Sequence, residues 1–114
     1  MLERLPRTRF TTSTIWTEGP HTFTGVALAD LLDAVAARGR TLRAVALNDY
    51  EVTMPVAAAQ DGALVAYAMD GAAMSVRDKG PLWIVYPYDR SPDYQSETIY
   101  ARSIWQLRRI HVAD

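Results

Sequence analysis

The apolar residues that follow Ala27 are spaced as on one face of a helix. They stand at positions i, i+3, i+4 and i+7, and they are Leu28, Leu31, Leu32 and Val35. This is the pattern of an amphipathic helix that packs one stripe against a core. Gly39 follows the stripe, and a glycine there readily adopts the left-handed conformation that ends many helices. The pattern predicts one helix that starts at Ala27 and ends before Gly39.

Most of the remaining apolar residues lie in short runs typical of β-strands. These runs are rich in β-branched and aromatic residues, and turn-forming Gly, Pro, Asn and Asp separate them. The predicted strands are residues 7–16, 22–26, 41–47, 51–54, 64–69, 82–86 and 109–112. Between them we predict turns at 18–21, 48–50 and 70–71, a helical turn at 56–60, a polar excursion at 72–79, a loop at 88–96 and a short helix at 99–107. The order of elements predicts an α+β fold with more strand than helix.

Composition and charge fit one folded domain that does not bind nucleic acid. The chain has 114 residues, of which 49% are hydrophobic and 22% charged, and a chain of this length can bury a stable core. We therefore predict a single domain over residues 1–114. Twelve basic and thirteen acidic residues give a net charge of −1, so no basic excess attracts phosphate backbones. We expect no membrane span, and no apolar segment of a signal peptide follows Met1.

The residue types that most often carry catalysis are scarce. The chain has no cysteine, which excludes disulfides, thiolate metal ligands and a cysteine nucleophile. Its two histidines, His21 and His111, are too few for a His-rich metal site, and we expect both to be ordinary surface residues. The GxSxG, Walker A, GxGxxG and HExxH motifs are also absent. We predict no catalytic residues and no metal ligands.

Aromatic and charged residues gather instead at the ends of the predicted segments. They are Trp16, Tyr50, Tyr86, Tyr88, Tyr100, Arg102, Trp105 and the run Arg77-Asp78-Lys79. Side chains at strand ends meet at one rim of a sheet, where binding loops are normally carried. Aromatic faces with charged groups between them suit a flat, polar heterocycle. The alternative is packing: we expect Tyr67, Trp83 and Trp105 to fill the core, and both interpretations stay open for Trp16, Tyr50 and Arg77.

Five segments follow one another in an order that matches a known pattern. They are Phe23–Leu32, Asn48–Pro55, Ala66–Gly71, Gly80–Pro87 and Leu107–Val112. They resemble the F-x-G-V-x-L-x-D-L-L, G-Y-x-x-x-I-P, L-A-x-x-x-D-G, G-x-P-L-R-L-V-V-P and L-x-x-I-x-V segments of the molybdopterin-binding domain of the sulfite oxidase family. The resemblance covers nearly the whole chain. It implies a sulfite oxidase-like fold of mixed β-sheets with short helices.

The chain differs from this family in the residue that binds the metal. In catalytic members a cysteine in the loop after the first strand binds molybdenum, and the matching stretch here is Thr12-Ser13-Thr14. Neutral hydroxyls replace a soft thiolate poorly. The Arg-rich segment that follows the cysteine is replaced by residues 15–18, Ile-Trp-Thr-Glu. These departures argue against oxygen-atom transfer, so we expect no bound molybdenum and lean towards a protein that is not an enzyme.

The chain also resembles short relatives that lack the cysteine. This resemblance implies a protein that binds a pterin, most often a reduced one, and catalyses no reaction. Asp49 or Asp78 would accept the paired donors of the ring's amino edge. Arg77, Lys79 or Arg102 would donate to its oxo group and ring nitrogen, and Trp16 or Tyr50 would stack on its faces. Ser13, from the stretch that matches the cysteine loop, completes the predicted ligand-binding set.

The resemblance also implies a partner and a compartment. Such relatives are exported to the periplasm, and some report pterins to a membrane signalling protein, so we expect the same here with a leader removed. The residues themselves fit the cytoplasm equally well. Two other hypotheses stay open: a molybdopterin-dependent oxidoreductase subunit that holds its metal without cysteine, and an interaction module whose pocket has closed.

Overall fold

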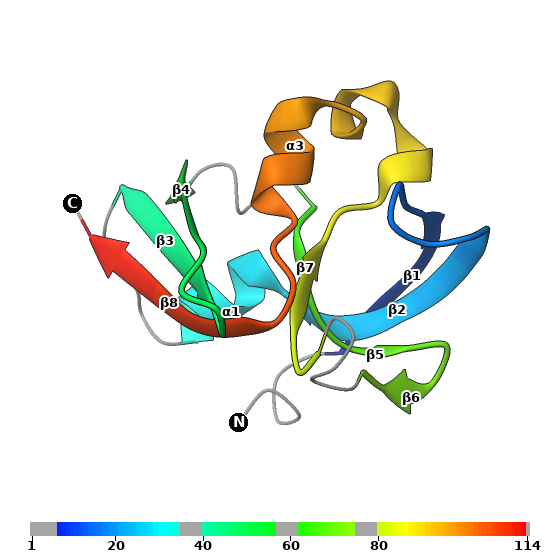
Figure 1. The fold of residues 1–114 in the computed structure, drawn as a ribbon, viewed down its shortest axis with the longest axis horizontal. Helices are drawn as coiled ribbons and strands as arrows, with labels where there is room; N and C mark the ends of the chain where they lie inside the picture. The colour runs from blue at the N-terminus through cyan, green and yellow to red at the C-terminus, as the bar shows by residue number, and fades with distance from the viewer. Residues whose placement is uncertain (1–6, 35–39, 57–61, 75–79, 114) are drawn as a thin grey trace.

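The computed structural model describes residues 7–34, 40–56, 62–74 and 80–113, and their strands form two antiparallel sheets (Figure 1). The first sheet has the order β1-β2-β5-β6, and β7 also pairs with β5. Its strands are β1 (Thr8–Ser13), β2 (Pro20–Ala27), β5 (Leu64–Met69), β6 (Ala72–Ala73) and β7 (Trp83–Val85). The second sheet has the order β4-β3-β8, formed by β4 (Glu51–Pro55), β3 (Thr41–Ala46) and β8 (Leu107–Ala113).

Short helices complete the described part of the chain. Helix α1 (Leu28–Ala34) follows β2 directly, and α3 (Glu97–Arg102) precedes β8. Two 3-10 turns, η2 (Tyr88–Arg90) and η3 (Pro92–Tyr94), lie between β7 and α3. In Figure 1, the second sheet lies to the left, β1 and β2 of the first sheet lie to the right, and α3 lies above with the 3-10 turns. No helix among the described residues is long and apolar enough to cross a membrane.

The core collects apolar side chains from both sheets and from both α-helices. Trp83 on β7 is fully buried, and its ring meets that of Phe23 on β2 edge to face at a centroid distance of 5.3 Å. Leu28 and Leu32 of α1 are buried as the predicted stripe requires. Each large aliphatic side chain buried in this way contributes about 1.5–3 kcal/mol. The predicted stripe therefore packs as expected, and its last position, Val35, lies outside the described residues.

Gly25 lies where β2 and β5 approach each other most closely. The pairing register of the two strands shifts between Thr24 and Gly25. A Cβ atom at residue 25 would lie 2.0 Å from the backbone oxygen of Val65 and 2.7 Å from the Cα of Ala66. No side chain fits at that distance, so the glycine in the first of the five matching segments is required by backbone contact.

The structure corrects several predicted boundaries. The first strand ends at Ser13 rather than at Trp16, because a turn begins after it in which the backbone N–H of Trp16 donates to Thr14 Oγ1 (3.1 Å). The short helix predicted at 99–107 spans Glu97–Arg102, because the Ser96 side chain caps its start. Part of the predicted polar excursion is β6, which pairs with β5 across the Asp70-Gly71 turn. The predicted helical turn at 56–60 lies mostly outside the described residues.

Candidate functional site

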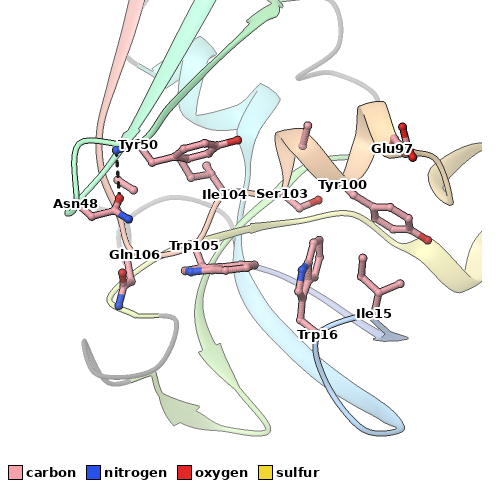
Figure 2. A pocket seen from close by; sticks show the side chains of 12 residues that line it. Ile15, Trp16, Asn48, Tyr50, Glu97, Tyr100, Ser103, Ile104, Trp105 and Gln106 are labelled. Atoms are coloured by element: carbon pink, nitrogen blue, oxygen red, sulfur yellow. Dashed lines mark hydrogen bonds between the residues drawn. The ribbon is translucent and has the colours of Figure 1, made fainter.

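A cavity of about 580 Å³ opens between three segments that are far apart in the sequence (Figure 2). These are the turn after β1, the turn between β3 and β4, and the stretch from α3 to the start of β8. The described residues that line it are Ile15, Trp16, Ala46, Asn48, Tyr50, Glu97, Tyr100, Ala101, Ser103, Ile104, Trp105 and Gln106. We call it the aromatic pocket. Its volume lies in the range of small-molecule sites, about 300–1,000 Å³.

Trp16 is the centre of the aromatic wall. Its ring meets four other rings edge to face, at centroid distances of 5.9 Å to Trp83, 6.2 Å to Tyr88, 5.7 Å to Tyr100 and 5.4 Å to Trp105. Such pairs contribute about 0.5–1.5 kcal/mol each beyond burial. Trp16 remains only half-buried, so it both packs and presents a surface to the pocket. The packing interpretation of this residue is therefore confirmed, and its role in ligand binding stays a prediction.

Local hydrogen bonds hold Tyr50 at the opposite side of the pocket. Its backbone N–H donates to Asn48 Oδ1 (3.1 Å), and its carbonyl accepts from Ala46 N (2.8 Å). Asp49 has a positive φ of 68°, which Asp tolerates better than most residues. The Tyr50 side chain is 54% exposed, and Figure 2 shows it facing the same space as Trp105.

A buried hydroxyl network holds Ser103, which lines the pocket. The Tyr88 hydroxyl donates to Ser103 Oγ (2.5 Å), which donates to the carbonyl of Ile99 (2.9 Å). The Trp83 indole N–H donates to the Ser103 carbonyl (3.2 Å). Burial raises the pKa of the Tyr88 phenol above its ordinary value, so this hydroxyl stays protonated. The network positions the chain between α3 and β8.

The backbone of this stretch continues into an uncommon conformation at Gln106. Its φ is 53°, and its carbonyl accepts from the N–H of Leu47 (2.9 Å). A left-handed non-glycine residue is uncommon and persists where its surroundings fix it. Gln106 and the preceding Trp105 both line the pocket.

Residues of the stretch that matches the family's cysteine loop form hydrogen bonds with Asp89. Ser13 donates to the Asp89 carboxylate twice, from its N–H (2.7 Å) and from its hydroxyl (2.6 Å). Thr12 Oγ1 accepts from the N–H of Asp89 (3.0 Å). The Ser13 hydroxyl and backbone bonds hold the pKa of Asp89 below its ordinary value. These bonds fasten β1 to η2, and the hydroxyls are already paired.

His21 lies at the surface as the sequence predicts, but it is paired with two oxygen acceptors. Its Nδ1 lies 2.5 Å from Asp70 Oδ2, and its Nε2 lies 3.0 Å from the Glu18 carbonyl. Because both ring nitrogens face oxygen acceptors, the protonated ring can donate to both. The hydrogen bond to Asp70 raises the pKa of His21. The bond to His21, and then that from the Thr22 N–H, lower the pKa of Asp70.

Stability should therefore depend on this pair within a pH window. The Asp70 contribution is present above its unfolded pKa of 3.8 and is lost as the pH falls through its lower folded value. The His21 contribution is complete below its unfolded pKa of 6.5 and is lost as the pH rises through its higher folded value. We expect the difference in unfolding free energy between the wild type and His21→Gln to be largest between these limits. Urea unfolding across the pH range measures it, and a constant difference up to alkaline pH would contradict the assignment.

The structure brings some of the predicted site residues together and leaves others apart. Trp16 and Tyr50 line the aromatic pocket. Ser13, Asp49 and Arg102 do not belong to the described lining. Ser13 is held by Asp89, and Asp49 Oδ1 lies 3.7 Å from Arg108 Nη2. The predicted residues Arg77, Asp78 and Lys79 lie outside the described residues. The ligand-binding role of all eight predicted residues, Trp16 and Tyr50 included, stays a prediction.

Sequence reasoning missed most of the polar lining. Asn48, Glu97 and Gln106 line the pocket without having been predicted as site residues. Asn48 adjoins the predicted Asp49, so the sequence indicated the right turn but not the residue of that turn that lines the pocket. No sequence pattern indicated that Glu97 and Gln106 line the pocket, because their positions depend on the short length of α3 and on the bend at Gln106. Trp105, expected in the core, is half-buried and lines the pocket, whereas Trp83 is in the core as predicted.

Comparison with known proteins identifies the family. The model of the oxidoreductase molybdopterin binding domain matches residues 4–92, and the chain belongs to this family. The fold is similar to that in the crystal structure of the sulfane dehydrogenase SoxCD from Paracoccus pantotrophus. The TM-score is 0.71 with 18% sequence identity over 99% of this chain, which spans 33% of that chain. A search of curated proteins gives no match. The resemblance and the predicted sulfite oxidase-like α+β fold are confirmed.

The described residues fit one part of the cofactor that the family name implies. Aromatic faces and amide groups in the pocket suit the pterin ring. Among the described residues, no cluster of three His, Cys, Asp or Glu could hold a metal ion, and the sequence offers no thiolate. The described lining also carries no Lys, Arg or His for the cofactor's phosphate. The residue types of the lining suit the ring, whereas the chain has no cysteine that could bind molybdenum.

Proposed function

We propose that this molybdopterin-binding-type domain binds a reduced pterin without catalysing a reaction. The observation that carries the proposal is the aromatic pocket beside a cysteine-free loop. Trp16 and Tyr50 supply ring faces, and Asn48 and Gln106 supply amides that both donate and accept. None of these groups needs to transfer a proton or form a covalent bond. A cavity of about 580 Å³ is the reason to prefer binding over an interaction module with a closed pocket.

We propose that the domain binds the pterin in order to sense it. A domain that holds a pterin without consuming it can report the ligand to another protein. We propose a membrane signalling protein as the partner and the periplasm as the compartment. Both rest on the resemblance to exported relatives without the cysteine.

A second candidate function is that of a molybdopterin-dependent oxidoreductase subunit. The family match and the similarity to a sulfane dehydrogenase favour it. It requires molybdenum held without a thiolate, where hydroxyls are weaker ligands. Molybdenum that copurifies in stoichiometric amount would support this candidate over the first.

An anaerobic titration with a tetrahydropterin, followed by heat and by tryptophan fluorescence, tests the first candidate. We expect saturable one-to-one binding in the micromolar range or tighter. Trp16 and Trp105 line the pocket, and Trp83 contacts both, so the fluorescence should change on binding. A folded protein that gives neither heat nor a fluorescence change would contradict the proposal, and a metal assay would then examine the second candidate.

A further inference from the structure

We propose that the aromatic pocket selects a pterin without a phosphate group and that Glu97 sets this selectivity. The inference rests on the proposed pterin binding and names the class of ligand. The cofactor of the family carries a phosphate, but the described lining of the pocket has no basic residue that could bind one.

The charge of the described lining is negative. Of its twelve residues, Glu97 alone carries a charge at neutral pH. Arg102 is not part of the described lining, and neither is Arg108, whose Nη2 lies 3.7 Å from Asp49 Oδ1. The described residues thus give a phosphate no cation inside the pocket.

Glu97 is well placed to act on a ligand. It is the first residue of α3, directly after the capping Ser96, and its side chain is exposed. Among the described residues, its carboxylate makes no hydrogen bond or ion pair. Figure 2 shows it on α3 at the Tyr100 end of the pocket, across from Asn48.

The two parts of a pterin ligand respond to this carboxylate in opposite ways. The ring's amino group and N3–H are donors, which a carboxylate accepts in a charge-assisted pair. A phosphate carries between one and two negative charges at neutral pH. At the rim of a pocket this produces a repulsion that salt weakens. A phosphorylated ligand therefore loses affinity relative to the same pterin without phosphate.

The test compares dihydroneopterin with dihydroneopterin monophosphate, a pair that differs only in the phosphate. At low ionic strength we expect the unphosphorylated compound to bind about tenfold more tightly, with the difference narrowing at high salt. Glu97→Gln, which keeps the size of the side chain, should reduce this preference about threefold or more. Glu97→Lys should reverse it. Asp93→Asn is the matched control, because Asp93 is an exposed carboxylate outside the described lining, and it should leave the preference unchanged.

The outcomes separate this inference from the function on which it rests. If the folded wild type binds neither compound, the proposed pterin binding fails and the selectivity fails with it. If it binds the monophosphate equally or more tightly, only the selectivity is overturned. A preference that Glu97→Gln leaves unchanged would overturn the role of Glu97. Thermal melts of each variant confirm that it is folded.

Discussion

Replacing Gly25 with alanine should lower the free energy of unfolding by about 3 kcal/mol or more, which is the upper part of the range for overpacked sites. The new Cβ would lie 2.0 Å from the Val65 oxygen, so β2 and β5 must separate or break their pairing. The φ of Gly25 is outside the left-handed region, and alanine therefore meets no strain from its own backbone. Urea unfolding of both proteins measures the difference, and most domains have only about 5–15 kcal/mol in total.

Gly71→Ala is the matched control for this change. Gly71 has a φ of 84° but no atom within 4 Å of its added Cβ, so its substitution strains the backbone without a clash. We expect it to destabilise by about 1–2 kcal/mol. A Gly25→Ala protein as stable as the wild type, or less affected than Gly71→Ala, would contradict the close approach of β2 and β5.

The elements that could be predicted are those specified by local pattern. Leu28 and Leu32 define α1 because their helical spacing and their burial agree. The run from Thr41 to Ala46 forms β3 because its β-branched and apolar residues fit a strand between two neighbours. Both are determined within a few residues of sequence, so no tertiary information was needed.

The pocket could be predicted only in part, because tertiary contacts place its residues. Trp16 was predicted at the end of a strand, yet a turn after Ser13 brings it among four aromatic rings. Gln106 lines the pocket because of a left-handed φ of 53°, and no turn signal precedes it. The family match ends at residue 92, so seven of the twelve described lining residues, from Glu97 to Gln106, lie beyond the matched region. Sequence pattern identified the aromatic residues but not the polar groups between them.

Trp16→Ala should weaken binding of a tetrahydropterin about 10- to 100-fold, the range for removing one ring that stacks on a flat base. It should also destabilise the fold by about 2–4 kcal/mol, because a half-buried indole with four edge-to-face contacts is removed. Calorimetric titration below the lowered melting temperature measures affinity, and urea unfolding measures stability. We therefore expect this variant to lose both affinity for the pterin and unfolding free energy.

Two further variants separate the binding role of Trp16 from its packing role. Trp16→Leu fills much of the volume but offers no ring face, so it should recover part of the stability while affinity stays low. Ile15→Ala removes an apolar side chain that lines the same pocket but is 63% exposed, so it should change both quantities little. If Trp16→Leu binds the pterin as tightly as the wild type, the ring is not a stacking surface and Trp16 serves packing alone. If affinity instead follows the loss of the indole while stability recovers, Trp16 both packs against the core and binds the ligand.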